Sequence, residues 1–400
     1  MSEWQEYLLE DVIDKFIDYR GKTPTKTSSG VPLITAKVVK AGKILTPNEF
    51  IALEDYDDWM TRGFPEIDDV VLTTEAPLGE VALIKNKNVA LAQRIITLRG
   101  KKEVLHNPFL KYYFQNETGQ HELQSRASGT TVFGIKASVL KKVPIEIPVL
   151  EEQKAIASVL SSLDDKIDLL HRQNTTLERM AETLFRQWFV EEAQDDWEEV
   201  TLSSLCTLIT KGTTPTTLGH SFVVDGINFI KAESITDAGD FISGKFAKIS
   251  AETHMFLKRS IIKKSDVLCS IAGTIGRVAI VEDSILPANT NQAIAILRVD
   301  EAKCFSEFIY LFLKSDYFQE VMDGKVVHAV QPNLSLGEIG NTTLKLAPFE
   351  KLLEFRKLVK TIFDKKTNNL LQIQIQTLEK LRDNLLPKLM SGEVRVDSTQ

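Results

Sequence analysis

The sequence predicts an α+β protein in which a β-rich domain followed by a long helix occurs twice, with the two helices pairing as an antiparallel coiled coil. Short sequence features recur in the same order in both halves of the 400 residues. Short apolar runs separated by turn residues occupy the first part of each half, and a seven-residue apolar period occupies the last part. We therefore place β-rich domains at residues 1–149 and 193–348, and long helices at residues 150–192 and 349–392.

The internal repeat extends over nearly the whole chain. Each match is short, but the matches keep their order, which is typical of a duplication rather than of chance similarity between two α+β domains. The matched pairs, first half before second, are Trp4 with Trp197, 21–24 with 212–215, 69–72 with 266–269, 79–82 with 276–279, and 177–180 with 378–381.

The β-rich part of the first half contains four clear apolar runs, which predict short strands. A helix should follow Asn107 and Pro108, because asparagine is a good cap and proline is favoured in the first turn. Its counterpart in the second half lies near residues 306–317. The four apolar runs are 31–34, 70–72, 81–84 and 95–98.

The first long helix shows apolar side chains at alternating intervals of four and three residues, which is the pattern of a coiled coil. A helix from about residue 150 to 190 would be about 60 Å long at about 1.5 Å per residue. The seam has one polar position, whose amide either fixes the register of the pair or lies at a solvated gap. The seam residues are Ile156, Leu160, Leu163, Ile167, Leu170, Asn174, Leu177 and Leu184.

The second long helix is predicted from about residue 349 to 389 and is less regular, with a polar stretch at 365–369. A lone helix of this length would expose its apolar stripe to water, so the other long helix is the expected partner. The seam residues of the second helix are Leu371, Ile375, Leu378 and Leu385.

Composition limits the classes of protein to consider. The formal net charge is −7, whereas proteins that bind nucleic acid by bulk electrostatics are usually basic. No apolar run is long enough for a transmembrane helix, and the N-terminus lacks a signal-peptide core, so we expect a cytoplasmic protein. The 3 cysteines and 6 histidines lack metal-site spacing, so no metal site is expected.

Catalytic motifs are not recognisable in the chain. Asn107-Pro108-Phe109 lacks the second proline of an adenine methyltransferase loop, and no phosphate-binding loop is present. Glu152-Gln153-Lys154 has the letters of a nuclease motif, but it lies at a predicted helix start without an acidic partner on a nearby strand. We therefore expect no catalytic residue in this chain.

The layout resembles the specificity subunit family of type I restriction–modification systems. The resemblance covers essentially the whole chain and depends on the paired domain starts, on residues 143–154 leading into the first long helix, and on the C-terminal run 378–393. One departure is that the second proline-ended strand leads into residues 349–352, which lack the Glu-Glu-Gln of the first helix.

The resemblance implies two target recognition domains that each read one half of a split, asymmetric sequence in double-stranded DNA. It implies that the paired helices set the spacer between the half-sites and dock two methyltransferase subunits, which carry S-adenosylmethionine and methylate adenine. Restriction subunits, which act as motor and nuclease, would join them. The chain itself would be a non-catalytic reader without a cofactor of its own, since ATP and Mg²⁺ would also bind to partner subunits.

Loops between strands are the natural place for DNA contacts, because a rigid scaffold can orient basic and amide side chains toward phosphates and base edges. In the first domain the candidates are Arg20, Lys22, Thr23, Thr25, Lys26, Lys37, Arg94, Arg126, Thr130, Thr131 and Lys136. In the second domain they are Lys211, Thr213, Thr214, Thr216, Lys231, Asn291, Gln292, Lys325, His328, Gln331 and Asn333.

Alternative interpretations apply to one basic cluster and to the function of the whole chain. Lys258, Arg259, Lys263 and Lys264 are more typical of a solvated basic face than of a DNA contact. The alternative function is a duplicated coiled-coil scaffold that binds proteins and not DNA.

Overall fold

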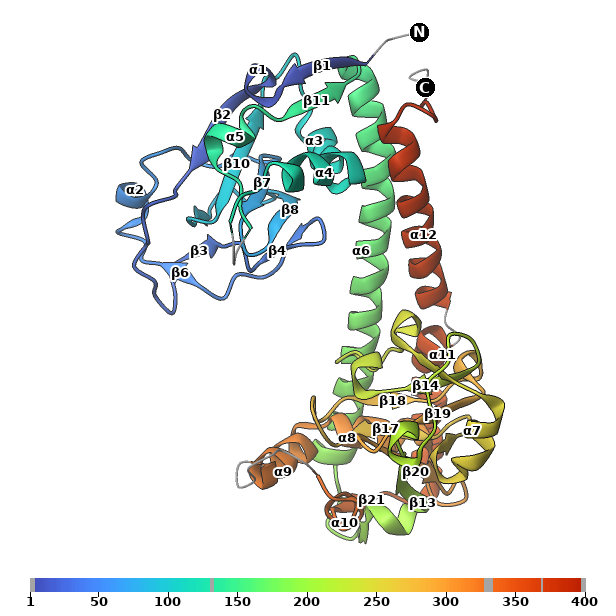
Figure 1. Ribbon diagram of the computed structural model, residues 1–400. Helices are drawn as coiled ribbons and strands as arrows, with labels where there is room; N and C mark the ends of the chain where they lie inside the picture. Colours follow the sequence, from blue (N-terminus) through green and yellow to red (C-terminus); the bar gives the residue numbers. More distant parts are fainter. Residues whose placement is uncertain (1–3, 130–132, 327–333, 368–369, 397–400) are drawn as a thin grey trace. The chain divides into compact units, whose positions relative to one another are not determined.

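The computed structural model describes residues 4–129, 133–326, 334–367 and 370–396. The chain divides into two compact units, here called unit 1 and unit 2. Unit 1 contains Met1–Asp168 and Gln376–Gln400, and unit 2 contains Leu169–Ile375. Each unit holds one β-rich domain and part of the long helices (Figure 1). The predicted domain limits, which separate the domains from the helices, stay a prediction.

The β-rich domain of unit 1 is built around a four-stranded antiparallel sheet in the order β2-β10-β7-β8. A second sheet has the order β6-β3-β9, and its β3–β9 pair is parallel. Two further pairs are β1–β11 and β4–β5. The strands are β1 Gln5–Leu8, β2 Ile13–Asp18, β3 Val31–Ile34, β4 Val39–Lys40, β5 Lys43–Ile44, β6 Phe50–Ile51, β7 Val70–Thr74, β8 Leu78–Leu83, β9 Ala90–Leu91, β10 Ile95–Gly100 and β11 Pro144–Ile147. The four predicted apolar runs are therefore confirmed as strands.

Helix α3 covers the four-stranded sheet of unit 1 with buried aromatic side chains, including Phe109 and Phe114. Pro108 lies in its first turn, as predicted. Asn107 does not cap the helix: its Oδ1 accepts a hydrogen bond from the N–H of Gly100 at 2.8 Å, which ties the helix start to β10. The helices of this domain are α1 Leu9–Val12, α2 Tyr56–Trp59, α3 Asn107–Gln115, α4 Glu117–Ser125 and α5 Ala137–Leu140.

The β-rich domain of unit 2 repeats the order of the main sheet, while its second sheet has one strand more than that of unit 1. Its four-stranded sheet has the order β13-β20-β17-β18, a second sheet has the order β15-β14-β19-β16, and β12 pairs with β21. The strands are β12 Glu198–Thr201, β13 Cys206–Lys211, β14 Ile227–Ile230, β15 Ala247–Ile249, β16 Ile261–Ile262, β17 Val267–Ser270, β18 Val278–Ile280, β19 Ala288–Thr290, β20 Ile294–Val299 and β21 Thr343–Leu346. The helices are α7 Ala251–Phe256, α8 Ser306–Lys314, α9 Asp316–Val326 and α10 Leu336–Gly340.

The duplication extends to individual ion pairs. In unit 1, Arg99 of β10 pairs with the buried Asp69 just before β7, with Nη2 2.7 Å from Oδ2. In unit 2, Arg298 of β20 pairs in the same way with Asp266, also at 2.7 Å. Both contacts are bidentate, a geometry in which two parallel hydrogen bonds set the side-chain orientation. The same pair therefore joins the two central strands of each four-stranded sheet.

The first long helix, α6, extends over Leu150–Arg186 and is followed by a π-helical segment, Gln187–Glu191. The residues expected to form the second long helix form α11, Phe349–Thr367, and α12, Leu370–Met390, with 368–369 outside the described residues.

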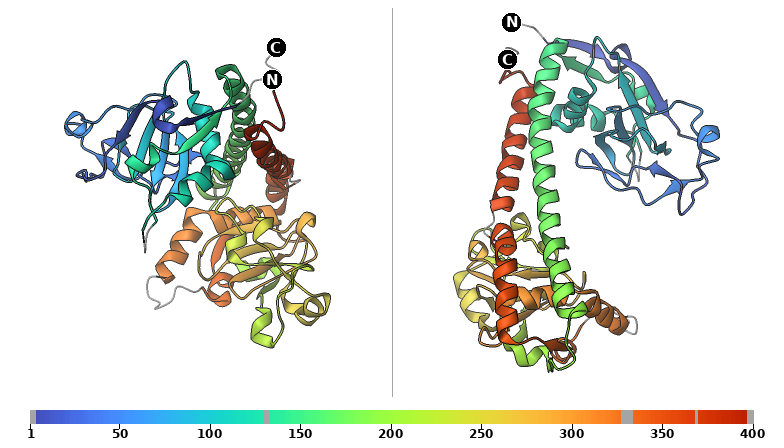
Figure 2. Two further views of the ribbon diagram at one scale, coloured as in Figure 1. Left: turned by 45° about the horizontal axis from the view of Figure 1, so that its top comes forward. Right: turned by 180° about the vertical axis from the view of Figure 1, so that it is seen from behind.

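Both units contain an antiparallel pair of helices. In unit 1, the beginning of α6 packs beside the end of α12 (Figure 2), where Ile156 shares a core with Leu389 and Asp164 bonds to Arg382. In unit 2, the end of α6 and the π-helical segment after it pack beside the beginning of α11, where Lys351 lies over the Trp188 ring and the Phe185 and Phe355 rings lie 6.2 Å apart. Residue numbers rise along one helix as they fall along the other, which confirms the predicted antiparallel direction within each unit.

The predicted seam residues are all buried or half-buried. The stripe also packs against the domains, since Ile156 and Leu160 belong to the core of the first domain. The buried seam residues are Ile156, Leu160, Ile167, Leu170, Asn174 and Ile375, and the half-buried ones are Leu163, Leu177, Leu184, Leu371, Leu378 and Leu385. Asn174 is 8% exposed and donates to Asp240 Oδ2 of the second domain at 3.0 Å, so the solvated-gap alternative is wrong.

Candidate nucleic-acid interface

One end of the four-stranded sheet in unit 1 gathers most of the predicted DNA contacts of the first domain. Asp18 at the end of β2 lies opposite Ile96 of β10, and Ile95 lies opposite Thr73 of β7. The loops that leave this end contain residues 19–30 and 92–94. We call this end of the sheet, with its loops, the loop end of unit 1.

The glycine turn at the loop end of unit 1 is held by contacts to its own strand and to two distant segments of the domain. Gly21 has a φ of +82°, a conformation that favours glycine. Arg20 pairs with Asp18 at 2.8 Å and donates to the carbonyl of Ile135 at 3.0 Å. Thr23 Oγ1 donates to Gln93 Oε1 at 3.2 Å, which joins the turn to the loop before β10.

Several predicted cations of the first domain already face a carboxylate. Lys26 pairs with Glu49 at 2.9 Å and Arg94 pairs with Glu75 at 3.1 Å. Arg126 pairs with Glu122 one helical turn earlier. These pairs lie near the surface and reduce the local positive charge, while the side chains of Lys22, Thr25, Lys37 and Lys136 are exposed.

Unit 2 has an equivalent loop end, where Lys211 at the end of β13 lies opposite Ala295 of β20. Only glycine fits at position 212, because the Cβ of any other residue would lie 2.0 Å from the carbonyl oxygen of Thr290. Thr214 Oγ1 donates to Gln292 Oε1, as Thr23 does to Gln93 in unit 1. Thr213, Thr214, Asn291 and Gln292 are thereby brought together, as are their counterparts in unit 1.

Lys231 follows β14 and also reaches this loop end, because β14 pairs in parallel with β19 and Ile230 lies opposite Thr290. Its Nζ lies 3.8 Å from Glu233 and 5.1 Å from the centre of the Phe222 ring. Thr216 is exposed in the turn after Pro215.

The remaining predicted contacts are not placed by the structure. The side chain of Lys325, in α9, lies outside the described residues. Thr130, Thr131, His328, Gln331 and Asn333 also lie outside them. All the individual DNA contacts stay predictions.

Two arginines at the loop ends were missed by sequence reasoning. Arg62 Nη1 donates to the carbonyls of Asp18 and Arg20, at the start of the glycine turn. Arg259, which the sequence placed on a solvated face, donates from Nη2 to Thr213 Oγ1 at 3.1 Å. The available signal was their matching place in the repeat, since each precedes the paired aspartate, Asp69 or Asp266, by the same interval.

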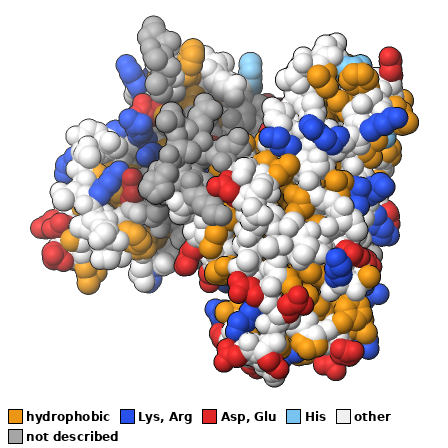
Figure 3. Space-filling model, turned by 90° about the horizontal axis from the view of Figure 1, so that it is seen from below, with side chains coloured by type: hydrophobic (Ala, Val, Ile, Leu, Met, Phe, Trp, Pro, Cys, Tyr) orange, Lys and Arg blue, Asp and Glu red, His pale blue; other side chains and the backbone are white. Residues whose placement is uncertain are grey.

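Basic side chains are unevenly distributed on the surface. In the face shown in Figure 3, several Lys and Arg side chains lie next to one another in a row. Asp and Glu side chains gather in a separate area of the same face. The whole chain has a net charge of −7. Local basic rows are the arrangement by which an acidic chain can still attract phosphate.

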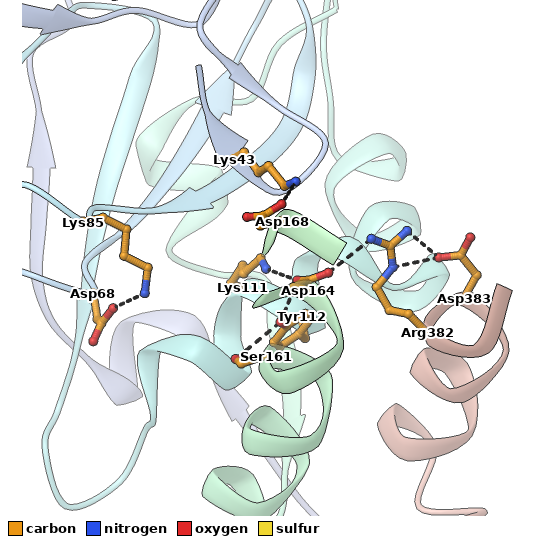
Figure 4. Close-up of polar contacts among 10 residues, drawn as sticks. All are labelled: Lys43, Asp68, Lys85, Lys111, Tyr112, Ser161, Asp164, Asp168, Arg382 and Asp383. Atoms are coloured by element: carbon orange, nitrogen blue, oxygen red, sulfur yellow. Dashed lines mark hydrogen bonds and ion pairs between the residues drawn. The ribbon is translucent and has the colours of Figure 1, made fainter. Parts of the chain in front are cut away.

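A cleft of about 500 Å³ in unit 1 is lined by the domain and by acidic residues of α6. Asp164 accepts hydrogen bonds from Lys111 at 2.8 Å and from Tyr112 Oη at 2.7 Å (Figure 4). It also accepts one from Arg382 of α12 at 3.1 Å. Burial alone would raise the pKa of Asp164, but the Lys111 charge and these hydrogen bonds hold it below its usual value. This carboxylate is therefore satisfied by the chain itself and joins three helices.

Unit 2 has a comparable buried carboxylate on α6. Glu178 accepts a hydrogen bond from Tyr310 Oη at 2.8 Å and forms an ion pair with Lys314, both on α8. Burial, followed by the nearby Glu178 carboxylate, raises the pKa of Tyr310 well above its usual value, so Tyr310 stays a hydrogen-bond donor. In each unit, a helix of the domain thus bonds to an acidic residue of α6.

Reactive groups of other kinds are not assembled in the described parts of the chain. No group of His, Cys, Asp and Glu residues suited to a metal ion occurs within those parts. Burial raises the pKa of Cys206, Cys269 and Cys304 to about 12, so each thiol stays protonated at neutral pH. None of the helices, so far as they are described, is long and apolar enough to span a bilayer.

Comparison with known families gives a match over most of the chain. The family model described as the type I restriction modification DNA specificity domain matches twice, at residues 1–179 and 194–380. The two matches correspond to the two copies of the internal repeat.

Individual relatives and a solved structure agree with the family model. The chain is 31% identical to the type I restriction enzyme MjaIX specificity subunit of Methanocaldococcus jannaschii, covering 84% of this chain and 79% of the relative. It is 25% identical to the EcoBI specificity subunit of Escherichia coli, covering 91% and 80%. The crystal structure of a type I restriction–modification S subunit from M. genitalium has the same fold, with a TM-score of 0.59, 18% identity and coverage of 97% and 96%.

Proposed function

The chain belongs to the type I restriction–modification DNA specificity family, and from this premise we propose that its two loop ends read the two halves of a split, asymmetric DNA sequence. Membership confirms the predicted role as a non-catalytic DNA specificity subunit and argues against a scaffold that does not bind DNA.

The observation that carries this proposal is the repetition of one loop end in two domains. Both loop ends present a glycine where the chain leaves the main sheet, a Thr–Gln hydrogen bond and an arginine that contacts the loop around this glycine. The side chains around this shared frame differ, since Arg94 in unit 1 is matched by Ala293 in unit 2 and Lys22 by Thr213. A shared frame with different surrounding side chains fits two different half-sites, because base edges are read by side-chain identity.

Partner subunits supply what the chain lacks in this proposal. Two methyltransferase subunits dock on the long helices and bring S-adenosylmethionine, and restriction subunits bring ATP and Mg²⁺. The net charge of −7 supports this division, because a chain with few surplus cations gains DNA affinity from its partners. We place the complex in the cytoplasm.

Co-expression tests the proposal directly. The chain is expressed with its methyltransferase subunit in a host without adenine methylation of its own, and modified adenines are mapped genome-wide. The expected result is one split motif with a fixed gap. The matched control is the methyltransferase subunit alone, which should give no such motif.

Swapping a loop end identifies which domain reads which half-site. Replacing residues 92–94 and 21–26 with the corresponding loops of another family member should change one half of the motif and leave the other half and the gap intact. A motif without two separable halves, or methylation that does not depend on this chain, would contradict the proposal.

A further inference from the structure

We infer that Arg62 and Arg259 are equivalent contacts to the phosphodiester backbone of double-stranded DNA, one in each domain. This inference rests on the proposed function and assigns a role to two residues that the sequence did not select. It concerns the position and charge of the two side chains at the loop ends and not the reading of bases.

Both arginines are held at the loop end by the turn that they contact. Arg62 donates to two backbone carbonyls at the end of β2, and its own N–H donates to the buried Tyr19 Oη at 3.0 Å. Arg259 donates to Thr213, directly after Gly212. A guanidinium has five N–H groups, so these contacts orient it and leave donors for a second acceptor.

The charge of the two arginines is not neutralised by an acidic side chain in the described parts of the chain. Among the described residues, neither Arg62 nor Arg259 forms an ion pair with a carboxylate. The other arginine pair that recurs in both halves behaves differently: Arg99 and Arg298 are bound to Asp69 and Asp266. Arg99 and Arg298 therefore each have a carboxylate partner and a structural role. Arg62 and Arg259 are exposed and have no carboxylate partner among the described residues.

Recurrence distinguishes backbone contacts from base contacts in this chain. If the two domains read different half-sites, residues that read bases should differ between them, whereas every half-site presents the same phosphates. Arg62 and Arg259 keep both residue type and place. The Thr–Gln hydrogen bond at the same loop ends also recurs, and it involves the Gln Oε1 and not the amide N–H₂.

The test measures DNA affinity of the assembled methyltransferase complex as a function of salt. Each phosphate contact contributes about 0.9 to the slope of log K against log salt. Arg62→Ala and Arg259→Ala should each lower that slope by about 1, and the double variant by about 2, on cognate and unrelated duplexes alike. The methylated motif should stay unchanged in all three variants.

Two controls separate this role from a structural one. Lys102→Gln removes one exposed charge past the opposite end of β10, where Lys101 bonds to Val12, and it should leave the slope unchanged. Arg62→Lys keeps the charge but not the forked donors, so it should keep most of the slope. If Arg62→Lys loses as much as Arg62→Ala while the fold is intact by circular dichroism, the arginine only supports the turn and the inference is wrong.

The outcomes also distinguish this inference from the proposed function. An unchanged salt slope in both alanine variants overturns the phosphate contact, even when the wild-type complex methylates a split motif. A motif altered at one half-site by either substitution overturns it as well, because the arginine then reads a base. Absence of any split motif with the wild-type chain contradicts the proposed function instead.

Discussion

Gln153 shows how one side chain can hold a domain on a helix. It is fully buried near the start of α6, where Oε1 accepts from the N–H of His106 at 2.9 Å. Its Nε2 donates to the carbonyls of Val104 and Pro148 at 2.9 and 2.8 Å. A family-like Glu-Glu-Gln motif at a helix start thus has a structural explanation in this chain.

Gln153→Ala should lower the free energy of unfolding by about 2 to 4 kcal/mol, because three backbone groups lose their partner in a dry environment. Urea denaturation followed by circular dichroism measures the effect. The adjacent exposed Lys154→Ala is the matched control and should cost less than about 0.5 kcal/mol. Equal effects of the two substitutions would show that water replaces the lost hydrogen bonds.

Asp164 links pH to the stability of unit 1. Its pKa in the folded protein lies below the ordinary value of 3.8, because its interactions with Lys111, Tyr112 and Arg382 outweigh the effect of burial. A carboxyl with a lowered pKa stabilises the folded state above its unfolded pKa, and this contribution is lost as the pH falls toward the folded pKa.

Asp164→Asn should therefore cost about 2 to 4 kcal/mol at pH 7, since it leaves Lys111 buried without its counter-charge. The difference from wild type should shrink as the pH falls below the ordinary value of 3.8. Denaturation series at several pH values measure it, with the exposed neighbour Asp165→Asn as control. A difference that stays constant down to acid pH would contradict the assigned charge state.

At the scale of elements, α6 serves both as a coiled-coil helix and as a platform for domain contacts. Part of its apolar stripe shares a core with Leu389 of α12 or Phe355 of α11, while Asp164 and Glu178 bond to helices of the two domains. Asn174 belongs to the same group, because its amide donates to Asp240 of the second domain. The polar seam position is thus explained by a domain contact.

Asn174→Asp should destabilise unit 2 more than Asn174→Ala at pH 7, by at least about 1 kcal/mol, because it brings a second carboxylate to within hydrogen-bond distance of Asp240. The extra loss should fall in acid, where one carboxyl takes up a proton and donates. Hydrogen exchange of α6 amides measures it, and Gln173→Glu on the exposed face is the control. An extra loss independent of pH would exclude charge repulsion.

At the scale of the whole molecule, the long helices connect two copies of one recognition domain. We expect their length to set the number of base pairs between the half-sites. One heptad adds about 10 Å at about 1.5 Å per residue, and half-sites are separated along DNA in steps of about 3.4 Å.

Inserting seven residues after Asp168 and after Ile375, where the two units meet in the chain, should lengthen the spacer by about three base pairs. Both half-sites should stay the same, because neither loop end is altered. Genome-wide mapping of methylated adenines measures the spacer. An insertion in α6 alone is the control, and it should abolish methylation because it shifts the seam of one helix against the other. An unchanged spacer after the double insertion would contradict the idea that helix length sets the spacer.

Sequence patterns determined the architecture of this protein, because strands, turns and heptads depend on local spacing. The paired starts Trp4 and Trp197, the glycine turns and the apolar stripe of α6 were sufficient for a duplicated α+β fold and for the family. The position of the two Gly-x-Thr-Pro loops also predicted where candidate DNA-contacting residues lie close together.

Only the tertiary structure decided which side chains meet. Arg382 interrupts an apolar stripe in the sequence, but it bonds to Asp164, which lies far away along the chain. The sequence around Arg259 indicates a solvated basic face, and only the structure shows its contact with Thr213. Such pairs depend on how distant strands and helices pack, and local periodicity contains no information about a partner that packing brings from another part of the chain.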